Sequence, residues 1–297
     1  MSAKTNERIY SIIITAICAL TALLCLYPLL YTLLVSFCAP QDINATYFLP
    51  IPQKFTVQAY AQVLTAGNYV IKAILVSLFR TVAGTVLSVV FCALFAYALS
   101  RKNLPGRNAV IKLVIFCILF NGGLIPTFVV IDSLNLRNNI WVYVIPNIMN
   151  VWNVIIIKQF FEGLPKDVEE AANIDGADEF TIFLKVVIPM SKPVIAAIGL
   201  FTMVGQWNSW FDAFLYVTQE HSHLWPLQYY IQISFNNLNQ INQGNLEKIE
   251  GIINIGNLDD MTIKMALTVI SCVPILVVYP FFQKYFTKGV YVGSVKG

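Results

Sequence analysis

The residue types that most often carry catalysis are scarce and scattered in this sequence. His221 and His223 are its only histidines, and no further cysteine or histidine lies near them to complete a metal site. The sequence contains no glycine-rich phosphate loop, no HExxH motif and no GxSxG motif. We therefore expect no catalytic residue, no metal and no cofactor bound by this chain.

The densest group of polar and small side chains lies in one hydrophilic loop between apolar stretches. Asp167 is predicted as the N-cap of a short helix over about 168–174, because Glu170 three residues later completes a capping-box-like pair. Gly176 suits the left-handed conformation that ends a helix. A second short helix is expected over about 178–186.

Together these two helices predict a helix-turn-helix finger within the loop 164–189, which is too short to be a domain. Its small residues Ala171, Ala172 and Gly176 would let another backbone approach closely. Both helices also have an apolar side that needs a partner. Two interpretations follow from the residues alone: a helix lying on lipid headgroups, or a docking surface for a cytoplasmic protein.

The composition indicates what surrounds this finger. Hydrophobic residues make up 57% of the 297 residues and charged residues 12%, whereas an average soluble domain has about 45–50% and about 25%. So few charges could not cover the surface of a soluble fold of this length. We therefore predict an integral membrane protein. The net charge of +3 gives no reason to expect nucleic acid as a partner.

Six apolar stretches are long enough to cross a bilayer, which takes about 20 residues. Unpaired backbone groups cannot face lipid, so each stretch is expected to be helical. The prediction is an all-α membrane protein with a single transmembrane domain, 1–297, and a long outer loop. The expected spans are 9–37, 73–99, 109–131, 140–157, 187–216 and 263–286, with the outer loop at 217–262 and a cytoplasmic tail at 287–297.

The basic residues are distributed unevenly between the two sides of this predicted topology. Of the 19 lysines and arginines, 13 fall on the side of the termini and of the finger, five fall on the other side, and Arg80 lies within the second span. The positive-inside rule then places both termini in the cytoplasm. An even number of spans places both termini on one side of the membrane, which agrees with this arrangement.

Several motifs carry a resemblance to a known family. The segment 170–177, EAANIDGA, followed by Ile188-Pro189, resembles the EAA loop of permease subunits of bacterial ABC importers, although the family usually has leucine before that proline. The C-terminal segment 283–297 resembles the tail of maltose-type carbohydrate permeases. The segments 120–127 and 207–213 resemble the branch that serves aldouronates and other complex oligosaccharides.

The resemblance implies a type I ABC importer permease with six transmembrane helices and cytoplasmic EAA coupling helices, in a bacterial plasma membrane. It implies a second homologous permease, two ATPase subunits that bind ATP and Mg, an extracellular binding protein and an oligosaccharide substrate, besides membrane lipids. The tail would reach along the ATPase interface, and the outer loop would probe the binding protein or cover the vestibule. The residues it assigns to ATPase coupling are Glu170, Ala171, Ala172, Asp175, Gly176, Ala177 and Pro189, with Glu170 as the charged anchor.

A sugar pathway needs polar groups and flat rings, because sugars offer hydroxyls and apolar ring faces. Polar side chains at membrane depth are costly unless they face protein or a cavity. An alternative for each is an interfacial aromatic belt or a helix–helix hydrogen bond. The predicted path residues are Asn121, Asn150, Asn153, Trp207, Asn208, Trp210 and Asp212, and Asn147, Trp152 and Gln206 are further candidates.

Charged groups inside the spans leave other interpretations open. Asp212 suits a cationic ligand, a pair with Arg80 or the outer water, and Arg80 suits an acidic sugar equally well. An ion-coupled secondary transporter or channel would show ionisable groups well within its spans, and Arg80 is the clearest such group. A membrane-embedded enzyme would need an acid–base or nucleophile cluster, which the sequence lacks.

Overall fold

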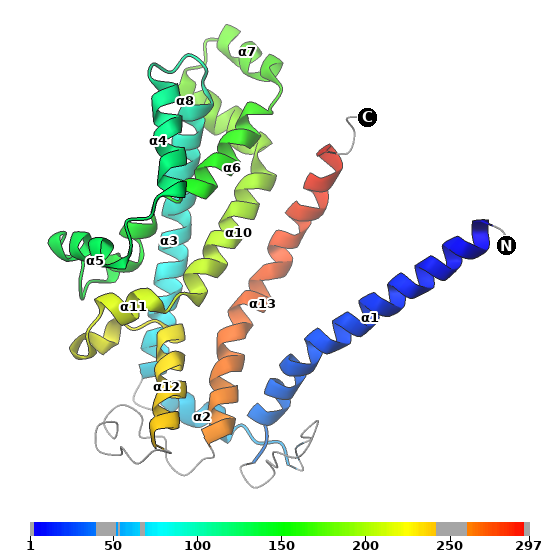
Figure 1. Cartoon of the computed structure of the whole chain (residues 1–297), viewed down its shortest axis with the longest axis vertical. Helices are drawn as coiled ribbons and strands as arrows, with labels where there is room; N and C mark the ends of the chain where they lie inside the picture. The colour runs from blue at the N-terminus through cyan, green and yellow to red at the C-terminus, as the bar shows by residue number, and fades with distance from the viewer. Residues whose placement is uncertain (1–2, 40–51, 53, 66–68, 242–259, 294–297) are drawn as a thin grey trace. The chain divides into compact units, whose positions relative to one another are not determined.

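In the part of the chain that the computed structural model describes, the elements are helices joined by loops and turns, and no strand occurs (Figure 1). The described residues are 3–39, 52, 54–65, 69–241 and 260–293. The chain forms two compact units. The first comprises Met1–Val70 and Ile233–Val273, and the second comprises Ile71–Gln232 and Pro274–Gly297.

Three helices are individually long and apolar enough to cross a membrane. They are α1 (Ala3–Ser36), α3 (Tyr69–Ser100) and α13 (Asp260–Gly293). They correspond to the first, second and sixth predicted spans. The apolar window of α1 is entirely unburied in the chain, so its surface is suited to lipid or to another apolar protein surface. In the same unit, the short α2 (Gln58–Thr65) holds Tyr60 2.7 Å from Ser36 through their hydroxyls.

The other three predicted spans are each broken into two helical parts. The parts are α4 (Arg107–Leu119) with α5 (Leu124–Ser133) at 116°, the 3-10 turns of Ile140–Asn147 with α6 (Val151–Glu162) at 46°, and Glu179–Met190 with α10 (Lys192–Asn208) at 80°. The described residues therefore hold three spans, or up to six if each bent pair counts as one. The predicted spans 109–131, 140–157 and 187–216 therefore contain breaks that their hydropathy did not reveal.

Glycine and proline explain where the breaks fall. Gly123 has φ +89, a left-handed conformation that disfavours other residues, and it separates α4 from α5. Pro146 lies in the 3-10 turn before α6, and Pro189 and Pro193 flank the break before α10. Proline lacks the amide hydrogen that a continuing helix needs.

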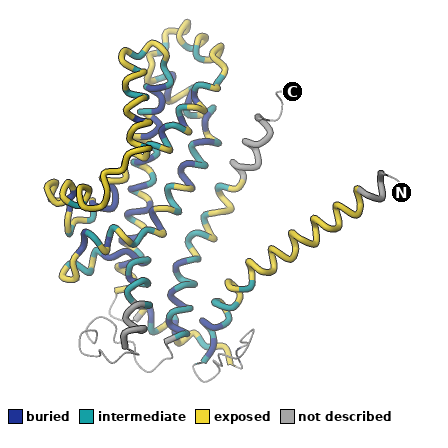
Figure 2. Tube along the Cα trace, viewed as in Figure 1, coloured by how far each residue is buried: buried dark blue, intermediate teal, exposed yellow. Residues whose placement is uncertain are grey.

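The core of the second unit is built around α3. Its buried residues include Cys92, Ala96 and Leu99 on α3, which pack with residues of α4, α6, α8 and α10. Figure 2 shows the buried residues following α3 and its neighbours, and exposed residues on the outer sides of the same helices. Helix α3 is therefore the central helix of the unit, and α4, α6, α8 and α10 all pack against it.

The finger consists of α7 (Lys166–Ile174), α8 (Glu179–Ile182) and a π-helical turn over Phe183–Val187. Gly176 has φ +80, so the predicted left-handed turn is confirmed. The predicted N-cap is wrong, because Pro165 occupies the cap and Asp167 lies in the first turn. A carboxylate there still interacts favourably with the helix dipole.

The predicted outer loop and tail are partly helical. After α10, the chain forms α11 (Phe211–Tyr216), a 3-10 segment at Gln219–Leu224 and α12 (Leu227–Ile241). The remainder of the loop, 242–259, lies outside the described residues. Helix α13 continues to Gly293, seven residues beyond the predicted end of the last span at 286. The final residues of the predicted tail, 294–297, also lie outside the described residues.

Candidate functional site

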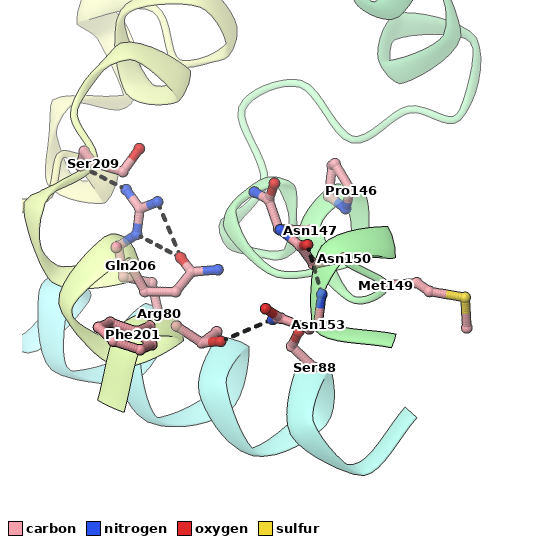
Figure 3. Close-up of a pocket in the computed structure, with 12 residues that line it drawn as sticks. Arg80, Ser88, Pro146, Asn147, Met149, Asn150, Asn153, Phe201, Gln206 and Ser209 are labelled. Atoms are coloured by element: carbon pink, nitrogen blue, oxygen red, sulfur yellow. Dashed lines mark hydrogen bonds between the residues drawn. The ribbon is translucent and has the colours of Figure 1, made fainter. Parts of the chain in front are cut away.

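A cavity of 360 Å³ lies within the second unit, between α3, the turn before α6, α6 itself and α10 (Figure 3). Uncharged polar side chains dominate its wall. Amide and hydroxyl groups act as both donors and acceptors, so this cavity suits a ligand with many hydroxyls. The lining residues are Arg80, Ser88, Pro146, Asn147, Met149, Asn150, Asn153, Phe201, Thr202, Gly205, Gln206 and Ser209.

The amides of this wall are held in place by helix capping and by a contact between helices. Asn150 is the N-cap of α6, and its side-chain oxygen accepts a hydrogen bond of 3.2 Å from the backbone amide of Asn153. The side-chain amide of Asn153 donates to the hydroxyl of Thr202 on α10, also at 3.2 Å. The start of α6 is therefore fixed to α10 at the cavity, as Figure 3 shows.

Arg80 forms one wall of the cavity and is only 1% exposed. Its guanidinium donates to both carboxylate oxygens of Asp212, with one of these distances 3.1 Å. It also donates to the backbone oxygen of Ser209 at 3.0 Å and twice to the side-chain oxygen of Gln206, at 3.3 and 3.2 Å. These five bonds occupy all five N–H groups of an arginine.

Two further contacts complete this cluster. The guanidinium carbon of Arg80 lies 4.6 Å from the centre of the Tyr143 ring, a favourable cation–π geometry. Gly84 allows Gln206 to approach, because a Cβ at position 84 would lie 2.8 Å from the Gln206 side-chain nitrogen. The cluster thus joins α3 to the break between α10 and α11.

The cluster decides among the alternatives that the sequence left open for Asp212. Asp212 pairs with Arg80, and its side chain is 14% exposed. An acidic ligand would have to displace Asp212 or Gln206 to reach this guanidinium, because every donor of Arg80 is already used. The cavity wall therefore presents amides and hydroxyls, and not a free cation, over the residues that the structure describes.

The structure does not gather all of the predicted path residues at this cavity. Asn150 and Asn153 line it, together with the further candidates Asn147 and Gln206, whereas the other predicted residues lie elsewhere. Their side chains make different contacts: Asn121 accepts from the backbone of Gly123, Trp207 is 3% exposed at a separate apolar pocket, Asn208 bonds Gln228, Trp210 contacts Phe211 and Phe214, and Trp152 is 63% exposed. Their role in a path stays a prediction.

Sequence reasoning missed Ser88, Phe201 and Thr202, although the sequence does contain a signal for them. Polar and small residues recur at 80, 84 and 88 on α3, and at 202 and 206 on α10 with 209 at its C-cap. Spacings of three and four residues place side chains on one face of a helix. A polar face of this kind on each of two spans, here the second and the fifth, indicates that the two faces line a common cavity.

The finger lies at the end of the second unit opposite to α11 (Figure 1). Of the predicted coupling residues, Glu170, Ala171, Asp175, Gly176 and Pro189 are exposed. Ala172 and Ala177 are half-buried and pack on the core. Exposed apolar side chains accompany them: Val168, Ile174, Phe180 and Leu184, of which Ile174 is 86% exposed. The finger therefore presents a mixed apolar and acidic surface.

Glu169, which sequence reasoning passed over in favour of Glu170, makes an ion pair with the body of the unit. Its carboxylate accepts a hydrogen bond from Arg101, which follows α3. Burial lowers the pKa of the Arg101 guanidinium, but hydrogen bonds to Tyr97 and Glu169 outweigh this effect and raise the pKa overall. Arg101 is therefore always charged.

Comparison with known proteins shows the family of the chain. No protein-family model matches the chain. The polygalacturonan/rhamnogalacturonan transport system permease protein YtcP of Bacillus subtilis is 38% identical over 292 residues, which cover 98% of this chain and 100% of that protein. The arabinooligosaccharides transport system permease protein AraQ of Halalkalibacterium halodurans is 29% identical, with all of both chains covered.

Solved structures agree with these relatives. A crystal structure of a bacterial ABC transporter involved in the import of the acidic polysaccharide alginate contains a chain with a TM-score of 0.84 and 30% identity. The match covers 96% of this chain and 99% of that one. A second chain, from an alginate ABC transporter in complex with an alginate pentasaccharide-bound periplasmic protein, has a TM-score of 0.60 and 13% identity, which shows the fold alone.

The relative that is 38% identical over 98% of this chain and the solved structure that is 30% identical over 96% of it are both parts of bacterial transport systems. The chain belongs to the family of permeases of sugar ABC transport systems. It is a multi-pass membrane protein and the permease of an oligosaccharide importer. The resemblance and the fold class predicted from the sequence are confirmed, and neither YtcP nor AraQ is named as an ion-coupled transporter.

The Arg80 cluster generates a prediction about stability. Arg80→Met leaves the mostly buried carboxylate of Asp212 without its partner, and breaking a buried pair costs about 3–5 kcal/mol. The midpoint of thermal unfolding of the detergent-solubilised protein should fall clearly. Arg137→Met is the matched control, because its pair with Asp132 is largely exposed and is worth about 0–1 kcal/mol. Equal shifts for the two variants would contradict the role assigned to Arg80.

Proposed function

We propose that this chain forms half of the pore of an ATP-driven importer for uronate-containing oligosaccharides, and that a second, homologous permease forms the other half. The observation that carries the proposal is the cavity of uncharged amides and hydroxyls within the second unit. The names of the relatives support the substrate class, because polygalacturonan is a polymer of a uronic acid and alginate is described as an acidic polysaccharide.

The chemistry of the cavity suits the neutral parts of such a sugar. Each sugar hydroxyl donates and accepts, and Asn147, Asn150 and Thr202 offer groups of both kinds. Phe201 lines the same cavity with its side chain 66% exposed, and a flat ring suits the apolar face of a sugar. In this proposal the cavity binds hydroxyls and ring faces, while the carboxylates of the substrate keep their water.

The finger is the proposed docking surface for a separate ATPase. Glu170 and Asp175 offer charge to a basic partner surface, and the exposed Ile174 and Phe180 offer apolar area next to it. ATP and Mg would bind the partner, and this chain would hydrolyse nothing. Two ATPase subunits would serve the two permeases.

This docking sets the orientation of the proposed complex. The finger and both termini face the cytoplasm, in agreement with the excess of basic residues on that side. The opposite side, which carries Gln219–Leu224 and α12, would meet an extracellular or periplasmic binding protein that delivers the sugar. A structure of an alginate transporter with such a protein supports this partner. The tail would extend along the ATPase.

A charge reversal on the finger tests the docking. Glu170→Lys changes an exposed side chain, so the chain should still fold and insert, but it should lose the ATPase subunit during purification and lose sugar uptake in vesicles. Lys102→Glu is the control, because it reverses an exposed charge on the same side outside the finger. A Glu170→Lys protein that retains its ATPase and full uptake would show that the finger lies on lipid instead.

Single substitutions test the cavity. Asn153→Ala removes a side chain that lines it, and one lost hydrogen bond of about 0.5–1.5 kcal/mol should reduce the uptake of a labelled oligogalacturonide at low concentration by about two- to tenfold. Asn208→Ala is the matched control, because Asn208 is an exposed asparagine outside the cavity. A larger loss for Asn208→Ala than for Asn153→Ala would place the sugar path elsewhere.

A further inference from the structure

Arg101 lies where the finger meets the body of the second unit. It directly follows α3 and hydrogen-bonds the carboxylate of Glu169 on α7. Its Nε also lies 3.3 Å from the carboxylate of Glu179 on α8, an ion pair whose angle does not make a hydrogen bond. One side chain therefore contacts both helices of the finger.

Tyr97, one turn earlier on α3, completes this junction. Its hydroxyl accepts a hydrogen bond from Arg101 and donates one of 2.6 Å to Glu179. The guanidinium of Arg101 lies 4.2 Å from the centre of the Tyr97 ring. The Tyr97 ring also packs against the ring of Phe183 at the base of the finger, with 4.9 Å between the ring centres. The arginine is thus held by a ring, a hydroxyl and two carboxylates.

This junction is the electrostatic connection between the finger and the rest of the chain. Among the described residues, both ion pairs that leave the finger end on Arg101. The nearby Arg107 pairs instead with Glu162, which connects α4 to α6. Charge-assisted hydrogen bonds have defined geometry, so Glu169 and Arg101 fix the position of α7 relative to the end of α3.

The same helix reaches the cavity. Helix α3 runs without a break over Tyr69–Ser100, and it carries Arg80 and Ser88 in the cavity wall. The helix from Arg80 to Ser100, next to Arg101, spans about 30 Å at about 1.5 Å per residue. Helix α6 also runs unbroken between the cavity and the finger, because its 46° bend lies before Val151, whereas the second arm of the finger meets α10 at a bend of 80°. Helix α3 differs from α6 and α10 because it is connected to the finger through side chains and not through the adjoining backbone.

We propose that Arg101 is the positioning residue that couples the finger to the cavity: it fixes α7 and α8 to the end of α3, so that a displacement of the finger moves the cavity wall as part of one rigid body. This inference rests on the proposed docking of an ATPase on the finger. At the far end, the Arg80 cluster connects α3 to α10 and α11, so the displacement reaches both sides of the cavity.

The test uses the complete complex in vesicles, with the second permease, the ATPase subunits and the binding protein, and it measures sugar imported per ATP hydrolysed. Arg101→Ala should retain the ATPase subunits and hydrolyse ATP within about twofold of wild type. Sugar per ATP should fall by at least about fivefold, the lower end of ordinary coupling between sites. Lys102→Ala, which removes the neighbouring exposed charge, should leave the ratio unchanged.

Glu169→Gln is the second variant, because it keeps the shape of the side chain and removes the ion pair, and it should lower the same ratio. An unchanged ratio in a folded Arg101→Ala or Glu169→Gln complex overturns the inference. So does a loss of ATPase subunits or of folded protein in both variants, since Arg101 would then be structural. A wild-type complex that contains no ATPase would instead contradict the proposed function itself.

Discussion

A hydrogen-bonding or charged group inside a bilayer must find its partner within protein or water, and this constraint underlies the whole structure. It makes every spanning segment helical. It also explains Arg80, a guanidinium that is 1% exposed and has all five N–H groups satisfied by Asp212, Gln206 and Ser209. The need to satisfy one arginine brings α3, α10 and α11 together and thereby shapes the cavity beside them.

The same constraint explains how the chain divides its polar groups. The uncharged amides Asn150 and Asn153 and the hydroxyl of Thr202 line a cavity, where they can be satisfied by one another, by water or by a sugar. The charged groups of the finger lie at the end of the unit, where Arg101 is 29% exposed. This ion pair is partly exposed and therefore costs less to bury than Arg80 does, so the end of the unit suits the charged junction of the finger.

Much of the fold followed from local patterns in the sequence. Long apolar stretches predicted the helices α1, α3 and α13, and Gly176 predicted the left-handed turn of the finger, which its φ of +80 confirms. The breaks within the other three spans were not predicted, although Gly123 and Pro189 lie at two of them. Hydropathy averaged over a span cannot resolve them, because a break of a few residues changes the average little.

The sequence by itself determined that the chain is a helical membrane protein and that its basic residues gather on one side of the membrane. It also determined that the finger resembles the coupling loop of importer permeases. These properties depend on composition and on neighbours within a few residues. Only the tertiary structure decided that Arg80 pairs with Asp212, 132 residues away, and that Arg101 binds Glu169, 68 residues away. Such pairs depend on how the helices pack, and a repeat of 3.6 residues reveals the face of a helix but not the helix that it meets.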